Sequence, residues 1–312
     1  MTKYIMKRLF IAVITTLVIL FALFLMLNYM PGTPFNDEKL SPEQKQMLIE
    51  KNGLDQPVPV RFVRYLGLML KGDFGISYAY QKNMPVANLL HQRLWISIRL
   101  GVYAVIVGLI FGIFLGIFAA LYHGTILDTL ASIISVLGVS VPSYVFALGL
   151  VYWLGFKHKL FPIRFDPRAP GLSSVLPVLA LSVFATATIA RFLRSEMLEV
   201  FGSDYIELAR AKGLPERKVI TDHGVRNSLI PVITVLGPLV VNLMTGSLVV
   251  EKIFAIPGLG NLLVEAINVN DYNIVIAVSF VYSVMFIVTM LLVDILYGVI
   301  DPRIRLAKGG AA

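Results

Sequence analysis

Six long runs of apolar residues, each free of Asp, Glu, Lys and Arg, dominate the pattern of this chain. They cover residues 9–36, 100–121, 129–156, 169–190, 227–250 and 272–293. A transmembrane helix needs about 20 predominantly apolar residues, and each run supplies that length. The pattern therefore predicts an all-α integral membrane protein whose six helices lie near 9–29, 98–121, 130–154, 175–193, 229–249 and 274–299.

The first apolar run also has features of a signal peptide, because Lys3, Lys7 and Arg8 precede it. The run from Leu9 to Leu27 is longer than the apolar region of a signal peptide, and no small-residue cleavage site follows it. We therefore expect an uncleaved transmembrane anchor.

The segments between the helices divide the chain further. We expect an N-tail with the first helix at 1–29, an external region at 30–97, a core domain with five helices at 98–299, and a C-tail at 300–312. Within the external region, Phe62, Tyr65, Leu66 and Met69 follow a helical spacing. This amphipathic stretch could be a cap on the membrane surface or a docking site for an external partner, and the pattern does not separate the two.

Composition excludes several classes of protein. Apolar residues make up 57% of the chain and charged residues 15%, against about 45–50% and about 25% in soluble domains. A soluble enzyme, a disordered chain and a nucleic-acid-binding protein are therefore excluded. Since there are no cysteines, disulfides, iron–sulfur clusters and thiol catalysis are excluded as well.

The distribution of Lys and Arg predicts the orientation. Short loops and tails carry 13 of them on the side of the two termini and of the 191–228 loop, against 5 on the opposite side. Short cytoplasmic loops are rich in Lys and Arg, so the N- and C-termini are expected in the cytoplasm. The net charge of +8 reflects this bias.

Glycines and prolines in the spans predict how the helices pack and bend. Gly108, Gly112 and Gly116, with Gly101 further back, recur on one face of the second span and permit close approach of another helix. Kinks are expected at the prolines inside the third and fifth spans, which are Pro142, Pro231 and Pro238. Static kinks and moving hinges both remain open.

The chemistry of a self-powered carrier or of an intramembrane enzyme is missing from the sequence. Asp294 is the only acidic residue within a predicted span, and all four histidines (His91, His123, His158 and His223) lie outside the spans. Ion-coupled transport depends on intramembrane ionisable groups. No phosphate-binding G-x-x-x-x-G-K-[ST] motif occurs. Energy for transport is therefore expected from another polypeptide.

The strongest local signal lies in the loop between the fourth and fifth spans. Asp204 with Glu207 three residues later predicts a capping box at the start of a helix. Gly213 suits the left-handed residue that ends a helix, and Pro215 suits the first turn of a second helix, from about 215 to 227. The first helix is largely apolar, which indicates either a protein partner or contact with anionic lipid.

Residues DYIELARAKGLP (Asp204 to Pro215), followed by RNSLIPVIT (Arg226 to Thr234), resemble the E-A-A loop of ABC-importer permeases. The likeness is closest to the first, B-type subunit of the oligopeptide/dipeptide permease family. Leu208 replaces the first alanine of the motif, and Ser228 stands where Ile is usual. Further similarities are GLDQPVPVRF (Gly53 to Phe62), KGDFGIS (Lys71 to Ser77), VEKIFAIPGLG (Val250 to Gly260) and the terminal DPR (Asp301 to Arg303).

The resemblance implies an ABC type I importer permease of the bacterial cytoplasmic membrane, which transports oligopeptides or dipeptides and is not an enzyme. The implied partners are a second homologous permease, two cytoplasmic ABC ATPases that bind ATP and magnesium, an external substrate-binding protein and membrane lipid, without nucleic acid. This chain would bind no cofactor or metal. The implied ATPase-coupling residues within the 194–228 loop are Asp204, Tyr205, Glu207, Ala209, Ala211, Lys212, Gly213, Leu214 and Pro215.

Polar residues within the spans are candidates for the translocation path: Ser140, Ser143, Thr186, Asn242, Thr245 and Ser247. Ordinary hydrogen bonds between helices are the other interpretation of each of them. A glutathione or nickel importer permease remains an alternative within the family, and a stand-alone secondary transporter remains one outside it.

Overall fold

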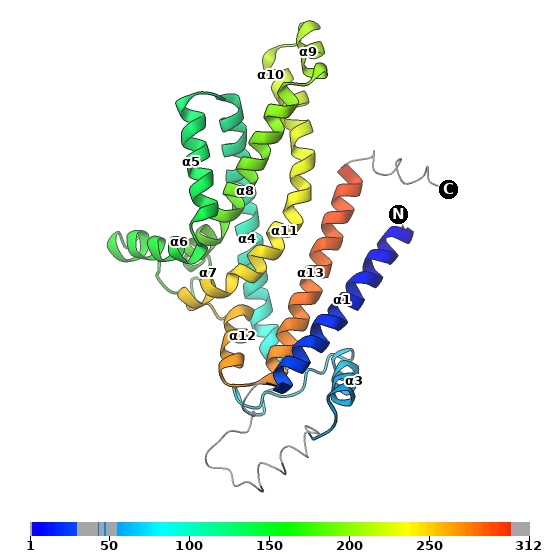
Figure 1. Cartoon of the computed structure of the whole chain (residues 1–312). Helices are drawn as coiled ribbons and strands as arrows, with labels where there is room; N and C mark the ends of the chain where they lie inside the picture. Colours follow the sequence, from blue (N-terminus) through cyan, green and yellow to red (C-terminus); the bar gives the residue numbers. More distant parts are fainter. Residues whose placement is uncertain (1, 30–42, 44–46, 48–54, 301–312) are drawn as a thin grey trace. The chain divides into compact units, whose positions relative to one another are not determined.

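The structure is a computed structural model that describes residues 2–29, 43, 47 and 55–300. Every regular element in these ranges is a helix (Figure 1). The chain divides into two compact units, each described by itself below. The terminal unit comprises Met1–Ser97 and Pro257–Val288, and the core unit comprises Ile98–Ile256 and Thr289–Ala312.

The terminal unit is built from α1 (Thr2–Tyr29), α3 (Val58–Met69), the start of α4 (Val86–Leu121), α12 (Leu259–Asn268) and the start of α13 (Tyr272–Ile300). Phe62 of α3 lies edge-on to Phe21 and Phe24 of α1, with ring centroids 5.1 and 5.7 Å apart. Met69 of α3 is buried in the same cluster. The apolar face of α3 is therefore packed within the chain. The two interpretations of this stretch, a cap on the membrane surface and a docking site for an external partner, both stay predictions.

A buried carboxylate shapes the segment after α3 that contains the KGDFGIS motif. Oδ2 of Asp271 accepts hydrogen bonds from Ser77 Oγ at 2.6 Å, Ala79 N at 2.9 Å and Tyr80 N at 3.1 Å. Asp271 is fully buried just before α13. Burial of a charged group is stable only when hydrogen bonds replace its hydration, and these three bonds fold residues 77–80 around it.

The core unit contains the rest of α4, then α5 (Ile126–Ser140), α6 (Ser143–Leu150), the π-helical segment η1 (Val151–Lys157) and α7 (Pro170–Ser173). It continues with α8 (Val175–Phe201), α9 (Asp204–Ala211), α10 (Glu216–Lys218), the π-helical segment η2 (Val219–Val225) and α11 (Arg226–Ile253). α8 lies at the centre of this unit, in contact with α5, α6 and α11 (Figure 1).

The glycine ladder of α4 packs against α8, as its spacing predicted. A Cβ atom added to Gly108 would lie 2.6 Å from Ala185 Cβ, and one added to Gly112 would lie 2.8 Å from Ile189 Cβ. Gly116 approaches the backbone of Ala190 equally closely. Only a residue without a side chain allows this approach. Gly101, in contrast, has no atom within 4 Å of such a Cβ, so it takes no part in the contact.

The third predicted span is not one helix, which corrects the prediction of a helix over 130–154. α5 ends at Ser140, and α6 begins at Ser143 with a bend of 106° between α5 and the α6–η1 segment. Val141 is extended (φ −81°, ψ 122°), as expected before a proline. In a continuous helix, Pro142 would lack an N–H donor and would collide with the carbonyl four residues earlier. The helix therefore breaks where a kink was predicted. α11, in contrast, continues as one helix through Pro231 and Pro238.

Within the described part of the chain, four segments are long and apolar enough to cross a membrane: Leu9–Leu27, Val86–Leu121, Val175–Phe201 and Tyr272–Val293. The bent pair Ile126–Ser140 and Ser143–Lys157 makes five if it counts as one span. The predicted span at 229–249 lies within α11, where the side chains of 238, 241, 242 and 244–247 fall outside the described residues. The chain is thus a mostly helical, multi-pass membrane protein.

Candidate coupling site

The helix predicted at 204–212 is present as α9 (Asp204–Ala211), but its start differs from the prediction. Ser203, not Asp204, occupies the N-cap position, with extended backbone angles of φ −89° and ψ 149°. The Ser203 hydroxyl donates to the carbonyl of Val200 at 2.5 Å and does not cap the helix. The predicted capping box of Asp204 and Glu207 is therefore wrong. Both carboxylates lie in the first turn, where the helix dipole favours negative charge.

The end of α9 agrees with the prediction and has the hydrogen bonds of a Schellman motif. Gly213 has a φ of +76°. Its N–H donates to Arg210 O at 2.9 Å, and the N–H of Leu214 donates to Ala209 O at 3.3 Å. Pro215 then takes the N-cap position of α10. The second predicted helix is present, because α10 and η2 continue without a break into α11.

One face of α9 packs against neighbouring helices of the core unit. Ile206 is fully buried and Ala209 is 5% exposed. They form one buried cluster with Val219 of η2, and Val200 of α8 packs against this cluster. Phe201 lies against Gly224 of η2, where an added Cβ would come 2.7 Å from its ring. These contacts fix the orientation of α9 on the end of α8.

The other face of α9 and the turn after it expose apolar side chains. Tyr205 is 42% exposed, Leu208 55% and Leu214 36%. Among the residues predicted for ATPase coupling, only Ala209 is buried, and the others are exposed: Asp204, Tyr205, Glu207, Ala211, Lys212, Gly213, Leu214 and Pro215. These exposed residues all belong to α9 and the turn that follows it, and we call this set the coupling surface.

An ion pair that the sequence analysis did not identify closes the turn after α9. Arg210 donates to Glu216 through Nη2 at 2.7 Å and through Nε at 3.3 Å. The guanidinium of Arg210 lowers the pKa of Glu216, and the carboxylate of Glu216 raises the pKa of Arg210. Both side chains are about half exposed, so this pair orients the turn more than it stabilises the fold.

A second ion pair missed by the sequence analysis joins α5 to α8. Asp128 Oδ1 accepts from Arg194 Nε at 2.6 Å, and Asp128 Oδ2 accepts from Arg194 Nη2 at 2.8 Å. The N–H of Gly124 also donates to Oδ2 at 3.1 Å, and His123 Nδ1 lies 3.0 Å from the same oxygen. Asp128 is 5% exposed. In the sequence, Asp128 directly precedes the apolar run 129–156, and Arg194 lies four residues after the run 169–190; nothing in either position pairs the two.

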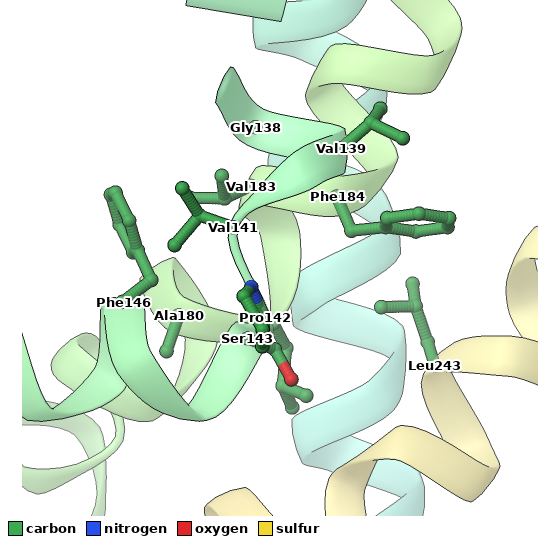
Figure 2. A pocket seen from close by; sticks show the side chains of 11 residues that line it. Gly138, Val139, Val141, Pro142, Ser143, Phe146, Ala180, Val183, Phe184 and Leu243 are labelled. Atoms are coloured by element: carbon green, nitrogen blue, oxygen red, sulfur yellow. The ribbon is translucent and has the colours of Figure 1, made fainter. Parts of the chain in front are cut away.

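Three of the residues predicted for a translocation path have described side chains, and only Ser143 among these three lines a cavity. Ser143 lines a cavity of about 230 Å³ at the break between α5 and α6, as Figure 2 shows. The rest of its lining is apolar and comes from α5, α6, α8 and α11 and from Val141 and Pro142 at the break. Ser140 is exposed nearby on α5, and Thr186 is half-buried on α8 outside this lining. The side chains of Asn242, Thr245 and Ser247 fall outside the described residues.

The same fold occurs in solved ABC transporters. The chain of an amino acid ABC transporter matches with a TM-score of 0.55 at 17% sequence identity, covering 67% of this chain and 93% of that chain. A chain of the MetNI methionine ABC transporter matches with a TM-score of 0.54 at 16% identity, covering 68% of this chain and 96% of that chain. These similarities show the fold alone.

Two family models cover most of the sequence. Residues 112–306 match the binding-protein-dependent transport system inner membrane component, and residues 1–101 match the N-terminal part of the same kind of membrane component. The dipeptide transport system permease protein DppB of Lactococcus lactis is 43% identical over 306 residues, with 98% of this chain and 100% of that protein covered. The oligopeptide transport system permease protein OppB of Haemophilus influenzae is 36% identical with the same coverage.

This chain belongs to the family of binding-protein-dependent transport system inner membrane components. The family resemblance inferred from the 204–234 motifs is confirmed, and so is the prediction of a transport component instead of an enzyme.

Proposed function

We propose that this chain is a permease subunit of an ATP-driven importer that carries dipeptides or oligopeptides across the bacterial cytoplasmic membrane. The names of its full-length relatives, dipeptide and oligopeptide permeases, support this substrate class. Residues 204–215 are the proposed contact with a separate ATPase subunit.

The observation that carries the proposal is the two-sided packing of α9. Its inner face is held by Ile206 and Ala209, while Tyr205, Leu208 and Leu214 are exposed on the outer side. Exposed apolar patches on otherwise well-packed segments mark interaction surfaces. A bound protein that contacts the exposed apolar side of α9 can displace the helices beneath it. The packed inner face prevents α9 from rotating about its own axis instead.

The proposed importer contains a second homologous permease, two cytoplasmic ABC ATPases that bind ATP and magnesium, and an external substrate-binding protein. In the proposed topology the chain crosses the membrane six times with both termini in the cytoplasm. The Lys and Arg bias of the short loops supports this orientation. α11 has 28 residues, enough for the sixth crossing.

Reconstitution of the complete importer in proteoliposomes tests the function. Peptide uptake should require ATP and the binding protein, and a panel with glutathione and nickel complexes decides between the related substrates. A Leu208→Glu variant should lose ATPase co-purification, because a charge replaces an exposed apolar contact. Val63→Glu is the control, since Val63 is 68% exposed on α3. ATP-independent uptake, or normal ATPase binding by Leu208→Glu, would refute the proposal.

A further inference from the structure

The coupling surface belongs to one packed body with the end of α8. Ile206 and Ala209 of α9 form one buried cluster with Val219 of η2, against which Val200 of α8 packs. Phe201 at the end of α8 fills the space beside Gly224. Because protein interiors are close-packed and resist deformation, a displacement of α9 moves the end of α8 with it.

α8 is in turn joined to α5 at two levels. Near the start of α5, Arg194 and Asp128 form a two-fold hydrogen-bonded ion pair at 2.6 and 2.8 Å. Near the end of α5, an added Cβ on Gly138 would lie 2.7 Å from Ala187 Cβ. Paired N–H···O bonds between guanidinium and carboxylate fix direction as well as distance. The ion pair therefore restrains both translation and rotation of α5 relative to α8.

α5 and α6 are joined much more loosely than α5 and α8. The extended residue Val141 and Pro142 separate them, and the axes bend by 106°. The cavity at this break has Gly138 and Val139 of α5 on one wall and Ser143 and Phe146 of α6 on the other, as Figure 2 shows. α6 itself packs against both α8 and α11. The opening of this cavity therefore changes when α5 moves with α8 while α6 is held by α11.

From these contacts we infer that Asp128 and Arg194 are positioning residues for transport. Their ion pair makes α5 follow the coupling surface, so that ATPase closure against α9 changes the exposure of the cavity at the α5–α6 break. The inference rests on the proposed function of residues 204–215. It adds a second route of transmission, through α5, to the continuous connection from α9 through η2 to α11.

The absence of native cysteines allows this route to be measured. Ser143→Cys places one thiol of this chain on the cavity wall, in an importer whose partner subunits are made cysteine-free. The rate of modification by a small water-soluble thiol reagent is compared between the resting complex and the complex trapped with ATP and vanadate. With the ion pair intact, the rate should differ about fivefold or more between the two states, the lower end of typical coupling between sites.

Arg194→Gln in the same background should abolish this difference and lower the amount of peptide imported per ATP hydrolysed. Arg194→Lys should keep part of it, because lysine retains the charge but not the paired hydrogen bonds. The control is Arg191→Gln, which removes the same charge from an exposed position on α8 and should behave like the parent. A role in stability alone would lower the yield of complex without changing the state dependence of labelling.

Three results would overturn the inference. One is a state-independent labelling rate with the ion pair intact, and another is a preserved rate difference with normal uptake per ATP in Arg194→Gln. The third is a loss of yield in Arg194→Lys with the labelling difference unchanged. In each case peptide import by the unmodified complex would leave the proposed function standing, whereas absence of import by that complex would refute the proposed function itself.

Discussion

Replacement of Gly213 tests whether the turn after α9 sets the position of the coupling surface. Gly213 has a φ of +76° and bridges α9 to α10. A Cβ added there would have no atom within 4 Å, so the cost of a side chain comes from the backbone alone. That cost is about 1–2 kcal/mol for an L-residue in the left-handed region.

A free-energy cost of this size changes the population of the native turn by a factor of about 5–30. Gly213→Ala should therefore weaken ATPase docking within this range, and Gly213→Val should weaken it more, because β-branched residues tolerate positive φ least. Asparagine visits the left-handed region readily, so Gly213→Asn is the matched control and should remain close to the parent.

In the assay, the purified pair of permeases is placed in lipid nanodiscs and titrated with its ATPase subunits to measure docking. Peptide uptake is then measured in cells that carry the same variants. Membrane insertion should be normal throughout, because Gly213 lies outside the predicted spans. Normal docking and uptake in Gly213→Val would show that this turn does not position the coupling surface. Equal impairment of Asn and Val variants would show that positive φ is not the reason for glycine here.

Four further predictions concern the start of α9, helix packing, topology and energy supply. Glu207→Lys should weaken ATPase docking less than Gly213→Val, because only the charge at the helix N-terminus changes; an effect as large as that of Gly213→Val would contradict this. Gly112→Ala should destabilise the purified chain by about 1–3 kcal/mol through overpacking, whereas Gly101→Ala should leave its thermal unfolding unchanged; equal melting temperatures would contradict the close contact with α8. On intact cells, a membrane-impermeant thiol reagent should label Gln81→Cys and not Gly213→Cys, and the opposite result would invert the topology. The purified chain alone should not hydrolyse ATP, and turnover by a preparation free of other subunits would disprove a separate energy source.

Within residues 204–215, the sequence predicted correctly those helix boundaries that depend on the backbone angles of single residues. Gly213 and Pro215 identified the end of α9 and the start of α10, because few residues adopt positive φ or lack an N–H. The start of α9 was predicted less well. Asp204 and Ser203 are both good N-cap residues, and the choice between them depends on where α8 ends, which the local pattern does not specify.

Packing inside the membrane could be predicted only in part. The glycines at 108, 112 and 116 identified the face of α4 that contacts another helix, but not that the partner is α8. The apolar runs carry no polar face, so their periodicity cannot tell which side of a helix is covered by protein. Pro142 likewise predicted a distortion of the third span. The angle between α5 and α6, however, depends on how α6 packs against α8 and α11, which the sequence pattern does not show.

The sequence by itself determined the membrane setting, the family and most of the long helices, because these follow from runs of apolar residues and from local motifs. Only the tertiary structure decided that Ile206 and Ala209 face inward while Tyr205 and Leu208 face outward. It alone paired Asp128 with Arg194, which are 66 residues apart. Such a pair depends on two helices lying side by side, and helix packing is a property of the whole chain that neither residue's neighbours in sequence specify.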